Sequence, residues 1–197
     1  HTVKRGEVHF VLGESGAGKS TFALNLIGIT HEANVEITTP QGTHLLTPEL
    51  NDSWFKHLGW VPQLPQLAHG SVRDQFTLIS KNASDIEIEK ILTRCGLEVR
   101  DLPQGLDSKV GGAGEGTNAA SGGQIRKIAV ARALFSQPQL LIADEPTADL
   151  DSSSSDLVMN ALREYATTGA IVICITHDLS IVRPDDSRQS FETVVRS

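Results

Sequence analysis

The chain has 197 residues, of which 39% are hydrophobic, and it carries a net charge of −7 at pH 7. This length suits one domain with room for an inserted subdomain. No stretch approaches the roughly 20 consecutive apolar residues of a membrane-spanning helix, so the sequence predicts a soluble chain. The acidic balance argues against a broad nucleic-acid-binding surface. Because it begins at His1, without methionine or a signal-peptide pattern, we expect a piece of a longer chain.

The two cysteines, Cys95 and Cys174, are not spaced as metal ligands. They therefore indicate reduced thiols in a cytosolic setting. Cys174 lies within an apolar run, residues 170–176, where a small buried side chain is expected.

A glycine-rich loop between an apolar run, residues 8–12, and a helical stretch, residues 22–29, is the first chemical motif. Its glycines allow a tight turn whose N–H groups point at a polyphosphate, and the helix N-terminus adds its positive end. Lys19 is placed to reach the β- and γ-phosphates, and Ser20 to bind the Mg²⁺ between them. A plain strand-to-helix turn is the alternative. The loop consists of Gly13, Glu14, Ser15, Gly16, Ala17, Gly18, Lys19, Ser20 and Thr21.

Strands alternating with helices follow, which predicts an α/β fold with a mainly parallel sheet. The expected strands are residues 8–12, 35–38, 45–46, 58–61, 140–143, 170–176 and an edge strand at 191–195. The expected helices are residues 22–29, one or two turns within 48–56, then 72–80, 86–94, 122–135 and 157–165. Ser84 or Asp85 is placed to cap one helix, and serines 152–155 another. The glycine-rich segment 103–123 predicts loop within a mostly helical insert.

Polar residues stand at the ends of three predicted strands, where parallel sheets bind ligands. Asp144 follows four apolar residues, a costly place for a carboxylate unless it faces a polar site. We therefore expect Asp144 to hold Mg²⁺ through a water or through Ser20. Glu145 would reach the water that attacks the γ-phosphate. A surface turn carboxylate is the alternative for Asp144.

Gln63 and His177 end two further strands. The amide oxygen of Gln63 is a candidate Mg²⁺ ligand at the joint with the helical insert, and an ordinary polar turn residue is equally compatible with the sequence. His177 is a candidate hydrogen-bond donor to the γ-phosphate, with a capping or core histidine as the alternative.

A second glycine-rich helix start lies in the insert and comprises Ala120, Ser121, Gly122, Gly123 and Gln124. Such a start is another anion-binding helix N-terminus. One chain would then have two phosphate-binding ends but only one nucleotide loop. A plain capped helix start is the alternative.

From about Lys4 to Asp178 these motifs, in this order, resemble the nucleotide-binding domain of an ABC (ATP-binding cassette) transporter. The ordered set is far more specific than any single motif. The resemblance assigns residues 13–21 to the Walker A loop, Gln63 to the Q-loop, residues 121–124 to the signature motif, residues 140–144 to Walker B, Glu145 to the catalytic carboxylate, residues 148–151 to the D-loop and His177 to the switch histidine.

The resemblance implies a P-loop NTPase fold with a RecA-like core, residues 1–63 and 124–197, and a helical subdomain, residues 64–123, that docks membrane domains. It also implies hydrolysis of ATP with Mg²⁺, with Glu145, His177 and Lys19 in catalysis. Two such domains would pack head to tail, Ser121, Gly122, Gly123 and Gln124 of each binding the ATP held by its partner. Asp151 would lie at the interface between the two domains. The resemblance also implies a location on the cytoplasmic side of a membrane and no nucleic-acid partner.

Residues 102–111, 61–63 and 71–74 are similar to exporter cassettes, including those of the cytochrome bd-assembly thiol exporters. An importer ATPase is the nearest rival. A soluble ABC ATPase acting on nucleic acid, or a P-loop kinase or GTPase, is a further alternative; the last leaves His177 and the signature motif unexplained. Ala120 replaces the usual leucine, and the chain begins too late for the family's adenine-stacking aromatic residue. We therefore expect weaker ATP binding than by a complete domain.

Overall fold

The computed structural model of the chain describes residues 2–14, 16–30, 34–39, 42–48, 51–111 and 119–191. Three predictions fall outside these residues. They concern Ser15 of the phosphate loop, the part of the predicted loop at 112–118, and the part of the predicted edge strand at 192–195.

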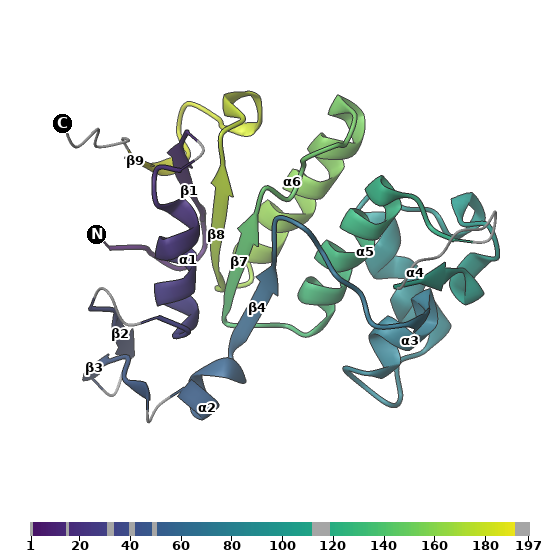
Figure 1. Ribbon diagram of the computed structural model, residues 1–197, viewed down its shortest axis with the longest axis horizontal. Helices are drawn as coiled ribbons and strands as arrows, with labels where there is room; N and C mark the ends of the chain where they lie inside the picture. Colours follow the sequence, from purple (N-terminus) through teal and green to yellow (C-terminus); the bar gives the residue numbers. More distant parts are fainter. Residues whose placement is uncertain are drawn as a thin grey trace.

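A five-stranded sheet in the order β4-β7-β8-β1-β9 forms the centre of the molecule (Figure 1). Each neighbouring pair in it runs parallel, which confirms the predicted α/β class. The carboxyl ends of the strands therefore meet at one edge. The strands are β1 (Val8–Gly13), β4 (Leu58–Val61), β7 (Leu140–Asp144), β8 (Ile171–Thr176) and β9 (Ser187–Phe191).

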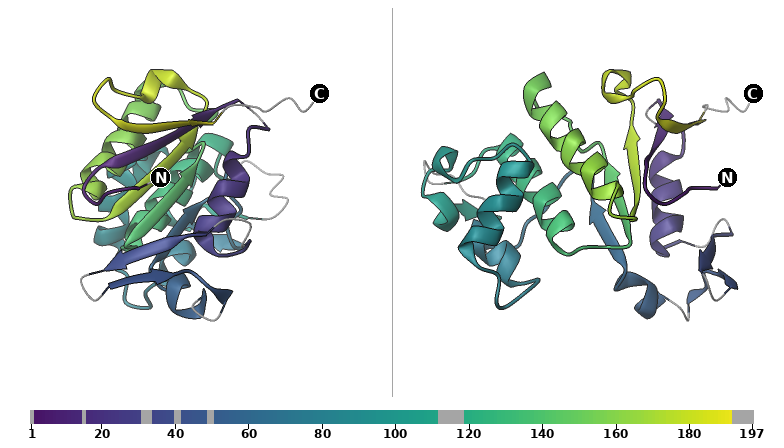
Figure 2. Two further views of the ribbon diagram at one scale, coloured as in Figure 1. Left: turned by 90° about the vertical axis from the view of Figure 1, so that its left-hand side faces the viewer. Right: turned by 180° about the vertical axis from the view of Figure 1, so that it is seen from behind.

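The side chains of the central strands alternate between two apolar clusters, one on each face of the sheet. Phe10 and Cys174 point into one cluster, and Val11 and Ile173 into the other. In Figure 1, α1 covers one face and α5 and α6 the other, and Figure 2 shows the same layers from behind. Burial on both faces explains why the central strands are continuous apolar runs. The covering helices are α1 (Lys19–Ile27), α5 (Gly122–Phe135) and α6 (Ser152–Ala166).

The segment between β4 and α5 lies on the far side of α5 from the sheet (Figure 1). It contains α3 (Val72–Thr77), α4 (Asp85–Arg94), two 3-10 turns, η2 (Val99–Asp101) and η3 (Gly105–Asp107), and a short antiparallel pair, β5 (Gly70–Ser71) with β6 (Lys109–Val110). The prediction of loop throughout 103–123 was wrong at η3 and β6. A two-residue strand has no hydrophobic period to reveal it.

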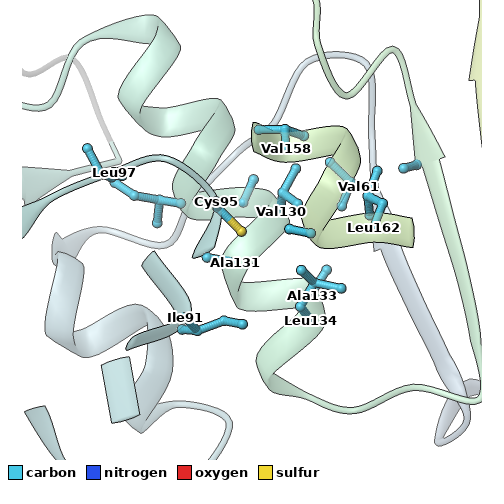
Figure 3. Close-up of a cluster of buried hydrophobic side chains, with 14 of the residues drawn as sticks. Val61, Ile91, Cys95, Leu97, Val130, Ala131, Ala133, Leu134, Val158 and Leu162 are labelled. Atoms are coloured by element: carbon cyan, nitrogen blue, oxygen red, sulfur yellow. The ribbon is translucent and has the colours of Figure 1, made fainter. Parts of the chain in front are cut away.

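Helix α5 joins this segment to the rest of the fold, because the larger apolar cluster continues through it. Side chains around the end of α4, along α5 and along α6 meet there, with β4 contributing one (Figure 3). The labelled members are Val61, Ile91, Cys95, Leu97, Val130, Ala131, Ala133, Leu134, Val158 and Leu162. Both cysteines are free and buried, and burial raises the thiol pKa of Cys95 to about 12.

A 3-10 turn, η4 (Leu179–Ile181), follows β8. Between α1 and β4 lie an antiparallel pair, β2 (Glu36–Thr39) with β3 (Gly42–Leu45), and the short helix α2 (Asn51–Phe55). These match the predicted strands and turns to within a few residues. Trp54 of α2 donates an indole hydrogen bond to the carbonyl of Leu26, 2.9 Å away, and so ties α2 to the end of α1.

Several element boundaries differ from the predictions; helix α3, for example, ends at Thr77 rather than at residue 80. Helix α1 begins at Lys19 rather than at residue 22, so the lysine of the phosphate loop is itself helical. Helix α6 begins at Ser152, and its N-cap is Asp151, so the serines form its first turn instead of capping a later start. Strand β9 ends at Phe191, where the predicted edge strand begins. Its first four residues are polar, so this edge strand has no continuous apolar run.

Within the part of the chain that the structure describes, no helix has the length and apolar character needed to cross a membrane.

Replacing Ser84 by alanine should destabilise the fold through α4 alone. The Ser84 hydroxyl accepts from the N–H of Glu87 at 3.4 Å, and the Ser84 N–H donates to the Glu87 carboxylate at 2.9 Å. Loss of a serine N-cap costs about 1 kcal/mol. Urea unfolding should show a loss of this size for Ser84→Ala and little change for Asn82→Ala, in the exposed turn just before the helix. An unaltered unfolding free energy in Ser84→Ala would contradict the capping role.

Candidate functional site

The predicted polar residues at the strand ends surround one cavity of about 640 Å³ at the carboxyl edge of the sheet. Its lining combines the glycine-rich loop with residues that follow β4, β7 and β8. The lining residues are Glu14, Gly16, Gly18, Lys19, Ser20, Thr21, Gln63, Asp144, Glu145 and His177. Residues up to 163 positions apart in the chain are thus brought together, as the alternation of strands and helices predicted.

The glycine-rich loop has the backbone that the sequence predicts for close approach to a ligand. Gly16 and Gly18 have φ angles of 83° and 91°, in the left-handed region that favours glycine. A Cβ atom added at either position would meet no described residue within 4 Å, so the described part of the chain leaves the space in front of both open. Gly18 is the N-cap of α1, and its carbonyl accepts the first helical hydrogen bond, from Phe22 at 2.9 Å.

Lys19 is folded back over this loop. Its ammonium donates to the carbonyl of Gly13 at 2.6 Å and to that of Glu14 at 2.8 Å, and the residue is only 8% exposed. The positive charge is therefore held at the mouth of the loop by two neutral acceptors.

Asp144 and Glu145 are positioned by the pairing of β7 with β8. Asp144 pairs with Ile175, and the N–H of Glu145 donates to the carbonyl of Ile175 at 2.8 Å. Both acidic residues are buried. Burial raises the pKa of Asp144, the charge of Glu145 raises it further, and Lys19 partly opposes both effects.

The Glu145 carboxylate is held by the two residues that end β8. Its Oε2 accepts from the Thr176 hydroxyl at 2.9 Å, and its Oε1 accepts from the His177 N–H at 3.1 Å. The His177 ring Nδ1 lies 2.6 Å from the same Oε1. Because a carboxylate in its ionised form can only accept, this contact is a hydrogen bond when Nδ1 carries the ring proton. The sequence placed both residues at one rim but did not predict this direct contact.

Gln63 follows β4 at the edge of the cavity, and its side chain is exposed. Its backbone carbonyl accepts from the guanidinium of Arg126 at 3.0 Å, and the same nitrogen donates to the carbonyl of Glu145 at 3.0 Å. Sequence reasoning missed Arg126. A charged residue in a predicted helix gives no local signal that distant backbone carbonyls surround it.

The second glycine-rich helix start is not part of this cavity lining. Ser121 is the N-cap of α5, and its hydroxyl accepts from the N–H of Gln124 at 3.3 Å. The Gln124 side chain accepts from the Ser121 N–H at 2.8 Å and donates to the Asp101 carbonyl at 2.8 Å. Among the described residues, none would lie within 4 Å of a Cβ added to Gly122, whereas one added to Gly123 would lie 3.3 Å from Leu150.

Asp151, predicted at an interface between two domains, uses its carboxylate within its own chain. It accepts from the Ser154 N–H at 2.9 Å and from the Ser154 and Ser153 hydroxyls at 2.7 and 2.5 Å. These hydrogen bonds hold the pKa of Asp151 well below its usual range. The site role of Asp151 stays a prediction, while its capping of α6 is a structural feature.

Comparison with known proteins identifies the family. The family model described as ABC transporter matches residues 1–148. The chain belongs to the ABC transporter family. The predicted resemblance and P-loop NTPase fold are therefore confirmed, and membership implies ATP binding in a family whose members are generally ATPases.

The chain is 37% identical over 183 residues to the glutathione/L-cysteine transport system ATP-binding/permease protein CydD of Escherichia coli, covering 90% of this chain and 29% of that protein. It is 36% identical over 186 residues to the ABC-type transmembrane transporter verA of Clonostachys rogersoniana, covering 92% of this chain and 14% of that protein. The structure of a bacterial Atm1-family ABC exporter with ATP bound matches with a TM-score of 0.77 at 25% identity, covering 98% of this chain and 33% of that one. The chain thus spans less than a third of the first relatives it matches, and these relatives do not favour an importer.

The cap at Asp151 predicts a specific pH dependence of stability. Because hydrogen bonds lower its pKa in the folded state, its contribution is present above the unfolded pKa of about 4 and is lost as the pH falls below it. Asp151→Ala should therefore lower the free energy of unfolding at pH 7 by more than it does at pH 3, as measured by urea titration. Asp156→Ala, at an exposed position of the same helix, is the control. An equal loss for Asp151→Ala at both pH values would contradict this account.

Proposed function

We propose that this chain is the ATP-binding and ATP-hydrolysing domain of an ABC exporter, with its nucleotide at the carboxyl edge of the sheet. The observation that carries the proposal is the single cavity lined by the glycine-rich loop with Lys19, by Gln63, by the carboxylates that end β7, and by His177. Phosphate-binding, metal-binding and proton-accepting groups meet there in one place.

ATP binding begins with the loop. The Lys19 ammonium now donates to two backbone carbonyls, and a triphosphate offers it charged oxygens in their place. A phosphate oxygen carries negative charge where a carbonyl oxygen is neutral, so the ammonium gains an attraction between opposite charges and the exchange favours the nucleotide. The open space in front of Gly16 and Gly18 leaves room for the phosphates, and the N-terminus of α1 adds its partial positive charge.

The oxygen donors in the cavity fit Mg²⁺. Among the described residues no group of three His, Cys, Asp or Glu side chains could hold a metal by itself. The cavity instead combines the Ser20 hydroxyl, the Gln63 amide and the Asp144 carboxylate. Mg²⁺ prefers a few such oxygens together with substrate phosphates and waters, so these residues would hold it only with ATP. The ion would neutralise charge on the phosphates.

Hydrolysis uses Glu145 and His177 as a pair. Glu145 is the general base that accepts a proton from the attacking water. His177 contacts the carboxylate through its N–H and its Nδ1, and its ring side chain is 70% exposed. Nε2 donates to the γ-phosphate when the ring carries a proton on both nitrogens. Thr176 holds the other carboxylate oxygen, so the base has one defined orientation.

A second nucleotide-binding domain completes the site in this proposal. Two domains pack head to tail, and the α5 start of each, with Ser121, faces the γ-phosphate on the other. The empty space at Gly122 and the capped, exposed Ser121 support this, because an anion can approach the helix end. Asp151 contributes at the interface by shaping the turn before α6.

Residues 1–63 and 124–197 form the RecA-like core in this proposal, and residues 64–123 a helical subdomain that docks transmembrane domains on the cytoplasmic side. Helix α5 is continuous across the boundary at 123/124. Leu78 and Ile86, 70% and 78% exposed, offer apolar surface for docking. The chain covers 29% of the glutathione/L-cysteine transport protein CydD, and we assign cargo choice to the membrane domains.

Glu145→Gln should retain ATP binding and lose hydrolysis. The amide keeps the shape of the side chain but accepts no proton, and loss of a general base lowers rates by about 10²–10⁴. Phosphate release and ATP binding, measured on the same preparation, should therefore separate. Glu89→Gln, on the exposed side of α4, is the matched control and should behave as the unsubstituted chain does. Normal turnover by Glu145→Gln would remove Glu145 from this role.

Gly122→Ala should leave the isolated chain as stable as before and block its ATP-dependent pairing. The added methyl group meets none of the described residues within 4 Å, so we expect an effect on pairing to come from the partner that approaches it. Sedimentation of Glu145→Gln with ATP should show a dimer, and the same protein with Gly122→Ala should remain a monomer. Lys90→Ala, exposed on α4, is the control. Equal dimer content in both would count against the head-to-tail arrangement.

A further inference from the structure

Arg126 is a buried cation whose contacts join three segments of the cavity rim. It lies in the first turns of α5, and its side chain is 6% exposed. One guanidinium nitrogen, Nη1, donates to the carbonyls of Gln63 and Glu145, both at 3.0 Å. The other, Nη2, lies 3.4 Å from a carboxylate oxygen of Asp149.

The two carbonyls lie just beyond the end of a strand ladder. The described pairing of β4 with β7 ends at Val61 and Ala143, and Gln63 and Glu145 each follow two residues later. Sheet hydrogen bonds therefore join β4 to β7 as far as Val61 and Ala143. Beyond these residues, the two hydrogen bonds of Arg126 join the segments that follow the two strands. The planar guanidinium presents several donors in a fixed geometry, which suits a bridge between two acceptors.

Two of the three segments have costly backbone conformations. Glu145 and Asp149 have φ angles of 50° and 60°, in the left-handed region that non-glycine residues rarely adopt. Such conformations persist only where the surroundings over-determine them. Arg126 contacts both residues, at the carbonyl of Glu145 and at the side chain of Asp149. The Arg126 guanidinium thus contacts both of these residues, whose backbone conformations are left-handed.

We propose that Arg126 is a positioning residue for metal–nucleotide binding. By bridging the carbonyls of Gln63 and Glu145 it fixes the separation between the two sides of the cavity, so that the Gln63 amide and the β7 carboxylates face one metal–ATP complex. This inference rests on the proposed function.

Binding of ATP with and without Mg²⁺ tests the inference on the full 197-residue chain. The ratio of the two dissociation constants measures the metal-dependent gain in affinity. Arg126→Gln leaves Lys19 and the glycine-rich loop intact, so binding in EDTA should change little. The metal-dependent gain should fall by about tenfold, the lower end of the range for residues that orient metal ligands. Arg126→Lys keeps the charge but supplies one compact ammonium instead of a fork, so the gain should fall there too.

Arg163→Gln is the matched control. Arg163 is also a largely buried arginine, on α6, and donates to the Ile181 carbonyl at 2.7 Å and to the Asp186 carboxylate at 2.8 Å. It is not among the residues that line the cavity. Its loss should lower the thermal midpoint of unfolding while the metal-dependent gain stays at the unsubstituted value.

The outcomes separate the two proposals. A reduced gain in both Arg126 variants, with a normal gain in Arg163→Gln, supports the positioning role. A normal gain in Arg126→Lys, or an equal reduction in Arg163→Gln, overturns it and leaves the proposed function standing. If the unsubstituted chain binds no ATP, the proposed function and this inference fall together. Should Arg126→Gln not fold, Arg126→Lys decides by the same ratio.

Discussion

The parallel register of β7 and β8 is the constraint on which the whole site depends. Asp144 pairs with Ile175, and the Glu145 N–H donates to the Ile175 carbonyl at 2.8 Å, so the ladder holds to the last residue of β7. The Glu145 carboxylate then meets Thr176 and His177 at the end of β8. A slip of one residue would send every side chain of β7 to the opposite face and separate these groups.

The apolar interior and the polar rim both follow from a parallel sheet that is covered by helices on its two faces. Central strands buried on both faces are rigidly packed, and their carboxyl ends are the places where the chain can turn polar without entering the core. Asp144 and Glu145 are nevertheless buried, which raises the pKa of Asp144. Acidic groups held at a cost beside the Lys19 ammonium are typical of sites that bind a metal and phosphate.

The sequence predicted the central strands and the rim residues, because continuous apolar runs and glycine patterns are local signals. It did not predict the features that depend on distant contacts. The Glu145–His177 hydrogen bond and the Arg126 bridge join segments that only the folded sheet brings together. Strand β9 and helix α6 were misplaced at their ends for a related reason. Polar edge residues and a serine-rich first turn, capped by Asp151, carry no hydrophobic period.

Amide hydrogen exchange of the full chain, with and without Mg²⁺ and ATP, tests the central claim most directly. The account predicts that the nucleotide slows exchange in four separate segments at once: the glycine-rich loop with Lys19, the residues around Gln63, those around Glu145, and those around His177. These segments are joined by the cavity and not by the sequence. Protection confined to the glycine-rich loop, or absent from all four, would contradict a single ATP site at the carboxyl edge of the sheet.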